Sequence, residues 1–403
     1  MAFATASPVA GRAPVLVFLG AAFAFLATML GTTLPTPLYP LYQAQFGFSQ
    51  LTITVIFAAY AVGVMGALIV TGRWSDQVGR RPLLFAGLIA AAASDALFLA
   101  SDSLAMLLVA RVVSGISAGI FTGTATVAVI ELAPPAWRRA ATFVATAANM
   151  GGLGMGPVIA GLLGQYAAWP LQLAYAVHLG LLVLAVAAVA CAPETVSRPA
   201  RPRLRLQRLS VPAEVRGAFL PAALAGFAGF ALLGFFTATA PAFMQQVLGQ
   251  SNLALIGLVA GMVFFASTLG QLVQGRFPSA WRLPLGCAIV IGGATMIGVG
   301  IALATLWLFL GGALIAGLGQ GIGFRAGLGA IAAASPADQR GSVTSTFFVV
   351  AYVALSIPVV GIGLVSRSIG LAATGVGFAG FVALLSGVAL VLLRRTGGGR
   401  GER

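Results

Sequence analysis

The sequence predicts an all-α integral membrane protein with twelve transmembrane helices arranged as two six-helix bundles. Hydrophobic residues make up 60% of the 403 residues and charged residues only 7%, whereas soluble domains are roughly 25% charged. Apolar runs recur along the whole chain at a length that crosses a bilayer, which takes about 20 residues. One long polar segment, residues 193–216, divides these runs into six and six.

The apolar runs are separated by short segments that carry charge, proline or glycine. We expect spans at residues 14–38, 50–72, 82–101, 104–131, 140–165, 168–191, 217–245, 252–275, 283–302, 306–333, 341–366 and 369–393. The first run follows Arg12 as a signal peptide would, but it is long for one and leads into further spans, so we expect it to be retained. The expected domains are a first bundle at 1–192, a basic linker at 193–216, a second bundle at 217–395 and a tail at 396–403.

The distribution of arginine predicts how the chain is oriented. All 22 basic residues are arginine, against eight acidic residues, and the net charge is +14. Positive charge marks cytoplasmic loops, and every arginine except Arg111, Arg325 and Arg367 lies at a terminus or in alternate loops on one side. We therefore expect a protein of the cell's inner membrane with both termini cytoplasmic. The arginines form no single patch, so nucleic acid is not an expected partner, and the linker is expected to lie on anionic lipid headgroups.

The two halves of the sequence are similar to each other at an offset near 202 residues. The Gly-x3-Gly pair at 115–119 matches the pair at 317–321, and the pattern Arg-x-Pro-Leu at 80–83 matches 282–285. Parallel repeats of this kind are typical of transporters, which bind substrate between the repeats near the bilayer midplane.

A short loop between the second and third expected spans, GRWSDQVGRRP at 72–82, holds four charged residues. Its glycines allow a tight backbone turn, and the carboxylate of Asp76 lies within reach of neighbouring arginines. The pattern Gly-x3-Asp-x2-Gly-Arg-Arg at this position resembles the loop signature of the major facilitator superfamily. The resemblance covers span count, the six-plus-six division and the central loop, and so nearly the whole chain.

The resemblance implies that this loop latches the two halves together when the central cavity faces outward. Simple anchoring by positive charge on the cytoplasmic side is the alternative. The matching loop of the second half, residues 275–284, has no acidic residue, so any latch is asymmetric. The residues expected to form the latch are Gly72, Asp76, Gly79, Arg80, Arg81, Glu131 and Glu194.

Two charged residues inside expected spans are candidates for proton coupling. Arg111 lies in LLVARVVSGISAG, which resembles the family's fourth-helix motif, whose arginine is implicated in proton coupling; snorkelling towards the interface is the alternative. Asp95 in the third span is the candidate proton carrier, with helix capping or an interface position as the alternative. Glu131 and His178 are weaker candidates. A lone histidine in an apolar span is more often simply hydrogen-bonded.

The fifth span contains the small-residue pattern GLGMGPVIAG. Gly152, Gly156, Pro157 and Gly161 resemble the motif associated with antiporter branches of the family, although Phe143 stands where a further glycine is expected. Close helix packing without any transport direction is the alternative.

Cavity residues are expected from span number alone, namely Asn149, Gln320, Arg325 and Tyr352, with ordinary helix packing as the alternative. The first span has no acidic residue while Arg111 and Arg325 lie inside spans, which favours a neutral or anionic substrate.

The sequence favours a transporter over an enzyme. One histidine and eight acidic residues leave no metal cluster, no phosphate-binding loop for ATP is present, and no cofactor is expected. The resemblance implies a secondary active transporter that works by alternating access as a monomer, with protons and a small-molecule substrate as its partners. We expect proton-coupled efflux of a small organic compound, such as a drug or metabolite. Proton-coupled uptake of a sugar or organic anion is the alternative.

Overall fold

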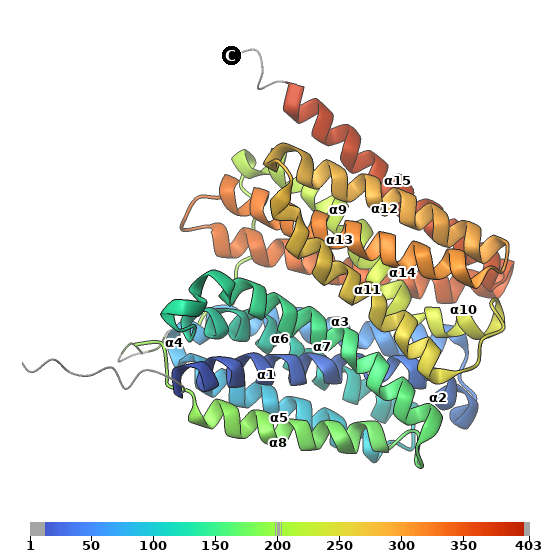
Figure 1. The fold of residues 1–403 in the computed structure, drawn as a ribbon, viewed down its shortest axis with the longest axis horizontal. Helices are drawn as coiled ribbons and strands as arrows, with labels where there is room; N and C mark the ends of the chain where they lie inside the picture. Colours follow the sequence, from blue (N-terminus) through green and yellow to red (C-terminus); the bar gives the residue numbers. More distant parts are fainter. Residues whose placement is uncertain (1–12, 198, 200–201, 203, 399–403) are drawn as a thin grey trace, which may run out of the picture.

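The computed structural model describes residues 13–197, 199, 202 and 204–398, and the regular structure of that part is helical throughout. Twelve of its helical segments are long and apolar enough to cross a membrane, which confirms the predicted number and the all-α class. Figure 1 shows them as two bundles lying side by side, the first in blue to green and the second in yellow to red.

The first bundle is built from six long helices, with two short α-helices and two 3₁₀ turns in its loops. Its elements are α1 (Ala13–Thr33), η1 (Thr36–Leu38), α2 (Tyr39–Phe46), α3 (Gln50–Thr71), α4 (Ser75–Val78), α5 (Arg80–Leu99), α6 (Leu104–Glu131), η2 (Pro135–Trp137), α7 (Arg138–Tyr166) and α8 (Leu173–Cys191).

The second bundle follows the polar segment and repeats this plan. Its elements are η3 (Ala213–Val215), α9 (Arg216–Ala238), α10 (Ala240–Gln246), α11 (Leu253–Val273), η4 (Gln274–Arg276), α12 (Ser279–Ala302), α13 (Leu306–Ala334), α14 (Arg340–Ile369) and α15 (Leu371–Gly398). Helix α15 continues three residues into the segment expected as a tail.

Each end of the molecule has its own short helices. We call the end with α4 and the polar segment the linker end, at the left of Figure 1, and the end with α2 and α10 the far end. At the far end the long helices of the first and seventh expected spans each stop before the predicted last residue of the span. Helix α1 stops at Thr33 and α9 at Ala238, and each chain continues in a short separate helix. Pro35 and Pro37 follow α1 and Pro241 follows α9, and proline interrupts the helical hydrogen-bond ladder.

The glycine pairs that the repeat analysis identified make equivalent contacts in the two bundles. Gly115 and Gly119 of α6 face carbonyl oxygens of α3, and Gly317 and Gly321 of α13 face carbonyl oxygens of α11. Small residues let helix backbones approach this closely.

The two bundles meet along two helix pairs, α7 with α11 and α3 with α14. A Cβ on Gly161 would collide with the carbonyl oxygen of Leu253, and one on Gly257 would collide with that of Pro157. On the other pair, a Cβ added to Gly363 of α14 would collide with the side chain of Thr54 of α3. These contacts lie towards the far end, which is therefore closed by backbone packed against backbone.

Candidate functional site

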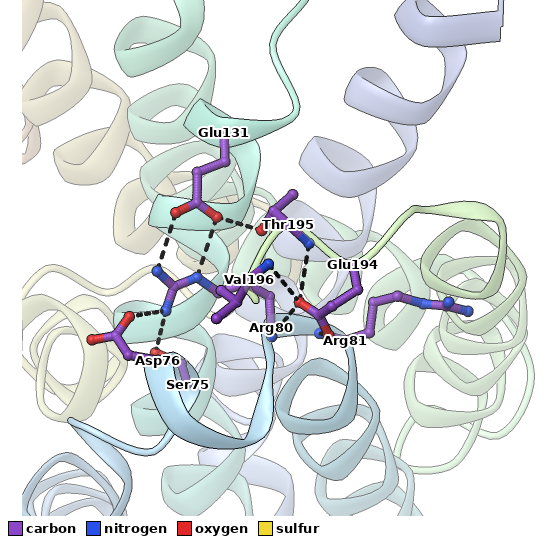
Figure 2. Close-up of polar contacts among 8 residues, drawn as sticks. All are labelled: Ser75, Asp76, Arg80, Arg81, Glu131, Glu194, Thr195 and Val196. Atoms are coloured by element: carbon purple, nitrogen blue, oxygen red, sulfur yellow. Dashed lines mark hydrogen bonds and ion pairs between the residues drawn. The ribbon is translucent and has the colours of Figure 1, made fainter. Parts of the chain in front are cut away.

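Arg80, the first residue of α5, is the centre of a charge cluster at the linker end (Figure 2). Its side chain is only 9% exposed. Nη1 donates to Ser75 Oγ and to Asp76 Oδ1, both at 2.6 Å, while Nε and Nη2 donate to the two Glu131 oxygens at 3.3 and 3.1 Å. This forked arrangement is the strong mode of arginine–carboxylate pairing. Gly79 supplies the turn from α4 into α5 with φ +108°, a conformation that favours glycine.

Glu194, which follows α8, caps the start of α5. Its carboxylate accepts hydrogen bonds from the backbone N–H groups of Arg80 at 2.8 Å and Arg81 at 3.2 Å. The first N–H groups of a helix have no partner within the helix, and negative charge is favoured there. Thr195, a neighbour that the sequence did not single out, donates to Glu131 and ties the polar segment to the cluster.

The structure thus brings together six of the seven expected latch residues, all from the first bundle and the start of the polar segment. In this conformation the hydrogen bonds of the cluster join α4, α5, α6 and the segment after α8. The two ion pairs of Arg80 both lie within the first bundle. The seventh residue, Gly72, lies beside Gln207 instead. A Cβ added to Gly72 would be 3.5 Å from the Cβ of Gln207.

Residues 207–210, which we call the linker strap, connect the two bundles at the linker end. The backbone N–H of buried Gln207 donates to the carbonyl oxygen of Ile69 in α3 at 2.7 Å. Three residues on, Ser210 Oγ lies 3.0 Å from Ser342 Oγ of α14, and Thr346 Oγ1 donates to the Ser210 carbonyl oxygen at 3.4 Å. Sequence reasoning expected this segment on lipid and did not find the strap, because nothing in its composition pairs it with either helix.

A cavity of about 1270 Å³ lies between the bundles, lined by α1, α3, α6 and α7 on one side and by α9, α11, α13 and α14 on the other. At the linker end its wall includes Glu214 of η3, just before α9, and Arg282 in the first turn of α12. At its deep end the wall includes Met29 and Thr33 of α1, but none of the far-end elements η1, α2 or α10. The cavity is therefore open at the linker end and closed at the far end.

Three of the four expected cavity residues, Asn149, Arg325 and Tyr352, line this cavity. Gln320 does not. It is buried beside α9 and α11, where its Oε1 accepts a 2.6 Å hydrogen bond from Ser267 Oγ. Span number alone placed Gln320 in the right helix but could not give its face, because α13 is apolar nearly all round.

A row of aromatic rings crosses the cavity from one bundle to the other, and sequence reasoning missed most of it. The ring centroids run from Phe57 to Tyr60 at 6.5 Å, to Tyr352 at 6.5 Å, to Phe230 at 6.3 Å and to Phe324 at 5.4 Å. All five rings line the cavity. In an apolar span an aromatic residue has no pattern that separates a cavity position from a packing position.

Arg111 of α6 also lines the cavity and is 1% exposed. Its Nη1 donates to the Thr32 carbonyl oxygen of α1 at 2.8 Å, and its guanidinium carbon lies 4.7 Å from the centroid of the Tyr60 ring. Its Nε is buried without a hydrogen-bond partner. A buried arginine costs about 2.5–3.5 kcal/mol on insertion scales, and this one does not snorkel to the surface.

Asp95 of α5 is not in the cavity wall but forms a buried pair with His178 of α8. Nδ1 of His178 lies 2.6 Å from Asp95 Oδ2, and Nε2 lies 2.8 Å from the Ala27 carbonyl oxygen of α1. A carbonyl oxygen only accepts, so Nε2 carries a proton and the two side chains share one more between them. The ring fits because Gly31 of α1 has no Cβ, which would collide with it.

Breaking this pair should destabilise the first bundle. We expect His178→Ala to lower the free energy of unfolding by about 3–5 kcal/mol, because it leaves the Asp95 carboxylate buried without a partner. The double variant Asp95→Ala/His178→Ala should cost clearly less than the sum of the two single variants, since the two residues are coupled. Thermal unfolding of the purified chain in detergent measures this, with Asp102→Ala in a far-end loop as the control. Additive losses would contradict the pairing.

The expected antiporter-like residues lie on two faces of α7. Cβ atoms on Gly152 and Gly156 would collide with carbonyl oxygens of α1, while Gly161 and the carbonyl of Pro157 face α11. This pattern therefore sets both the approach of α7 to its own bundle and its crossing with the second bundle.

No group of three or more metal-ligating side chains lies together among the described residues. The polar groups that do converge are the charge cluster, the buried Asp95–His178 pair and the cavity wall. They offer charge pairing, one shared proton and a large cavity that is open at the linker end. They show no assembled nucleophile and base within the part of the chain that the structure describes.

Known proteins resemble this chain in sequence and in fold. Its residues 21–357 match the family model described as Major Facilitator Superfamily. "Putative multidrug resistance protein MdtD" of Salmonella typhi is 30% identical over 149 residues, which is 37% of this chain and 32% of that protein. The protein of the same name from Cronobacter sakazakii is 30% identical over 149 residues, 37% of this chain and 31% of its own. The match thus spans about a third of the length of these relatives.

The solved structures that resemble it are transporters. A bacterial homologue of the human lysosomal transporter Spinster, in an inward-facing and unoccupied conformation, superposes with a TM-score of 0.73 at 15% identity, over 96% of this chain and 98% of that one. The human organic anion transporter MFSD10 superposes with a TM-score of 0.66 at 22% identity, over 96% and 100% of the two chains. With the family model covering most of its length and two six-helix bundles around a central cavity, this chain belongs to the Major Facilitator Superfamily.

Proposed function

We propose that the chain is a secondary active transporter that works by alternating access and exports a small organic compound in exchange for protons. The observation that carries this proposal is the cavity of about 1270 Å³ between the bundles, open at the linker end and closed at the far end. It exceeds the roughly 300–1,000 Å³ of ordinary ligand pockets and so has room for a drug-sized molecule.

The direction of transport rests on charge and on the relatives. Arginines gather at the linker end and mark it as cytoplasmic, so the protein lies in the inner membrane with both termini in the cytoplasm. The cavity then takes up its cargo from the cytoplasm. The protein acts as a monomer. The name of the MdtD relatives, multidrug resistance, supports efflux.

Helix α1 connects the candidate proton site with the cavity. His178 binds the carbonyl oxygen of Ala27, and Arg111 binds that of Thr32, five residues further along α1. Met29 and Thr32 of the same helix line the cavity. Gain or loss of the proton shared by Asp95 and His178 alters the hydrogen bond from His178 to α1. It thereby alters the part of the cavity wall that α1 forms. Arg111 stays protonated, so in this proposal its part is to hold α1 and the proton resides on the pair.

Everted membrane vesicles test the proposal. Respiration acidifies the lumen, and a dye reports lumenal pH while lipophilic cations, neutral drugs, sugars and organic anions are added outside. We expect at least one class to raise the lumenal pH, because each molecule that enters the lumen releases a proton. Asp95→Asn should abolish that response, whereas Asp102→Asn, in an exposed far-end loop, should keep it.

The same assay separates exchange from the alternative, proton-coupled uptake of a sugar or organic anion. Uptake in the cell carries substrate and proton in the same direction, so substrate added outside everted vesicles would lower the lumenal pH. A response of that sign, or an unchanged response in Asp95→Asn, would contradict the proposed proton exchange through this residue.

A further inference from the structure

Two buried arginines of this chain have opposite surroundings. Arg80 has two carboxylates and a hydroxyl around its guanidinium. Arg111 is more deeply buried, at 1% exposed, and its Nη1 donates to the backbone carbonyl oxygen of Thr32. No carboxylate within the described part of the chain forms an ion pair with Arg111. The acid of the third span is bound by His178 instead.

Arg111 nevertheless remains charged at any physiological pH. A buried cation without a counter-charge is unfavourable unless another anion reaches it. Its Nε has no partner and the residue lines the cavity, so a molecule in the cavity can supply the missing anion. Arginine suits this role, because its planar fork matches carboxylate, sulfonate and phosphate groups.

The cavity as a whole has the same sign. Its charged lining residues are Arg111, Arg325 and Arg282, against the single acid Glu214 at the linker end. The side chain of Arg325 forms no ion pair with any of the described carboxylates. An organic cation that enters this cavity therefore meets unpaired positive charge on both bundles.

The remaining lining is suited to an apolar body. The aromatic row begins beside Arg111, whose guanidinium lies 4.7 Å from the ring of Tyr60 and 5.6 Å from that of Phe57. It ends at Phe324, the residue that precedes Arg325. Flat rings offer stacking surfaces from Arg111 on the first bundle to Phe324 on the second.

The geometry points to one substrate class: an organic anion with an aromatic or otherwise apolar body, whose acidic group binds Arg111 while its body lies along the aromatic row. Arg325 on the second bundle adds a second favourable charge. This inference deepens the proposed function and rests on it, since it names the class of compound that the central cavity takes.

A matched set of naphthalene probes tests the inference by equilibrium binding. Naphthalene-2-sulfonate, naphthalene-2-sulfonamide and naphthalen-2-yl-trimethylammonium share one ring system and differ in charge. Isothermal titration of the purified full-length chain should show the sulfonate binding at least tenfold more tightly than the neutral sulfonamide, and the cation binding most weakly.

The variants assign the preference to the residue. Arg111→Gln should remove the preference for the sulfonate, Arg111→Lys should retain part of it, and Arg325→Gln should reduce it less. Arg367→Gln, at the far end of α14 and outside the cavity wall, is the matched control and should leave all three affinities unchanged. The lysine variant keeps the positive charge, and the thermal unfolding midpoint of Arg111→Gln shows whether its loss of binding comes from loss of fold.

The inference is overturned if the cation or the neutral probe binds as tightly as the sulfonate, if the sulfonate fails to bind, or if its preference survives in folded Arg111→Gln. These outcomes are separable from those of the vesicle assay, because equilibrium binding needs neither a proton gradient nor a direction. If the sulfonate binds but does not change the lumenal pH, only the proposed proton exchange is contradicted. If only cations raise the lumenal pH, only the proposed anion class is contradicted.

Discussion

Asp76→Asn is expected to slow transport at least tenfold while leaving the chain folded. The Asp76 side chain is 65% exposed and contributes one of the hydrogen bonds to Arg80, which keeps both of its bonds to Glu131 in the variant. An exposed ion pair is worth about 0–1 kcal/mol, so the unfolding midpoint should change little. The latch interpretation gives this carboxylate its main role in the conformation that is closed at the linker end, and transport must pass through that conformation.

The measurement is the initial transport rate of reconstituted protein, alongside thermal unfolding. Asp338→Asn is the matched control, because Asp338 is also an exposed acid at the linker end but belongs to the second bundle, between α13 and α14. Equal rates in Asp76→Asn and wild type would show that the loop only anchors the helices by charge. A folded protein in which both variants are equally slow would point to a general effect of surface charge.

Gly257→Ala is expected to abolish transport and to lower the unfolding midpoint. The new Cβ would point directly at the carbonyl oxygen of Pro157, at a distance that real contacts do not show. Both partners are helix backbone, so no side chain can turn aside and α7 must move away from α11. That helix pair is one of the two that join the bundles and close the far end.

Gly151→Ala on α7 is the control, because nothing lies within 4 Å of its Cβ position. Alanine favours a helix over glycine by roughly 1 kcal/mol, so this variant should be at least as stable as the wild type and should transport normally. Wild-type rate and midpoint in Gly257→Ala would contradict the backbone contact at this crossing.

The sequence was sufficient to predict the class, the number of spans and their six-plus-six division, because hydrophobic length follows from composition alone. It did not predict that the long helices of the first and seventh spans stop at Thr33 and Ala238. Apolar residues continue past Thr33 and Ala238, and only the prolines that follow signal the break into separate short helices. Hydropathy measures how much chain is apolar, and it carries no information on where a helix axis changes direction.

The candidate site divides in a similar way. The loop residues of the charge cluster are close together in the chain, so their pattern could be identified locally. The partner of Asp95 is 83 positions away on another helix, and a lone histidine in an apolar span has no periodicity that assigns it to a partner. The unpaired state of Arg111 is likewise a property of what surrounds it in space, which the sequence alone does not contain.

The linker strap limits how far the two bundles can part at the linker end. Gln207 is attached to α3 through Ile69, and Ser210 is attached to α14 through Ser342. The effective tether between the bundles is therefore the three-residue step from Gln207 to Ser210, and not the whole polar segment. Three residues span roughly 10 Å when fully extended. As long as both attachments hold, α3 and α14 cannot move apart at this point by more than this short tether allows.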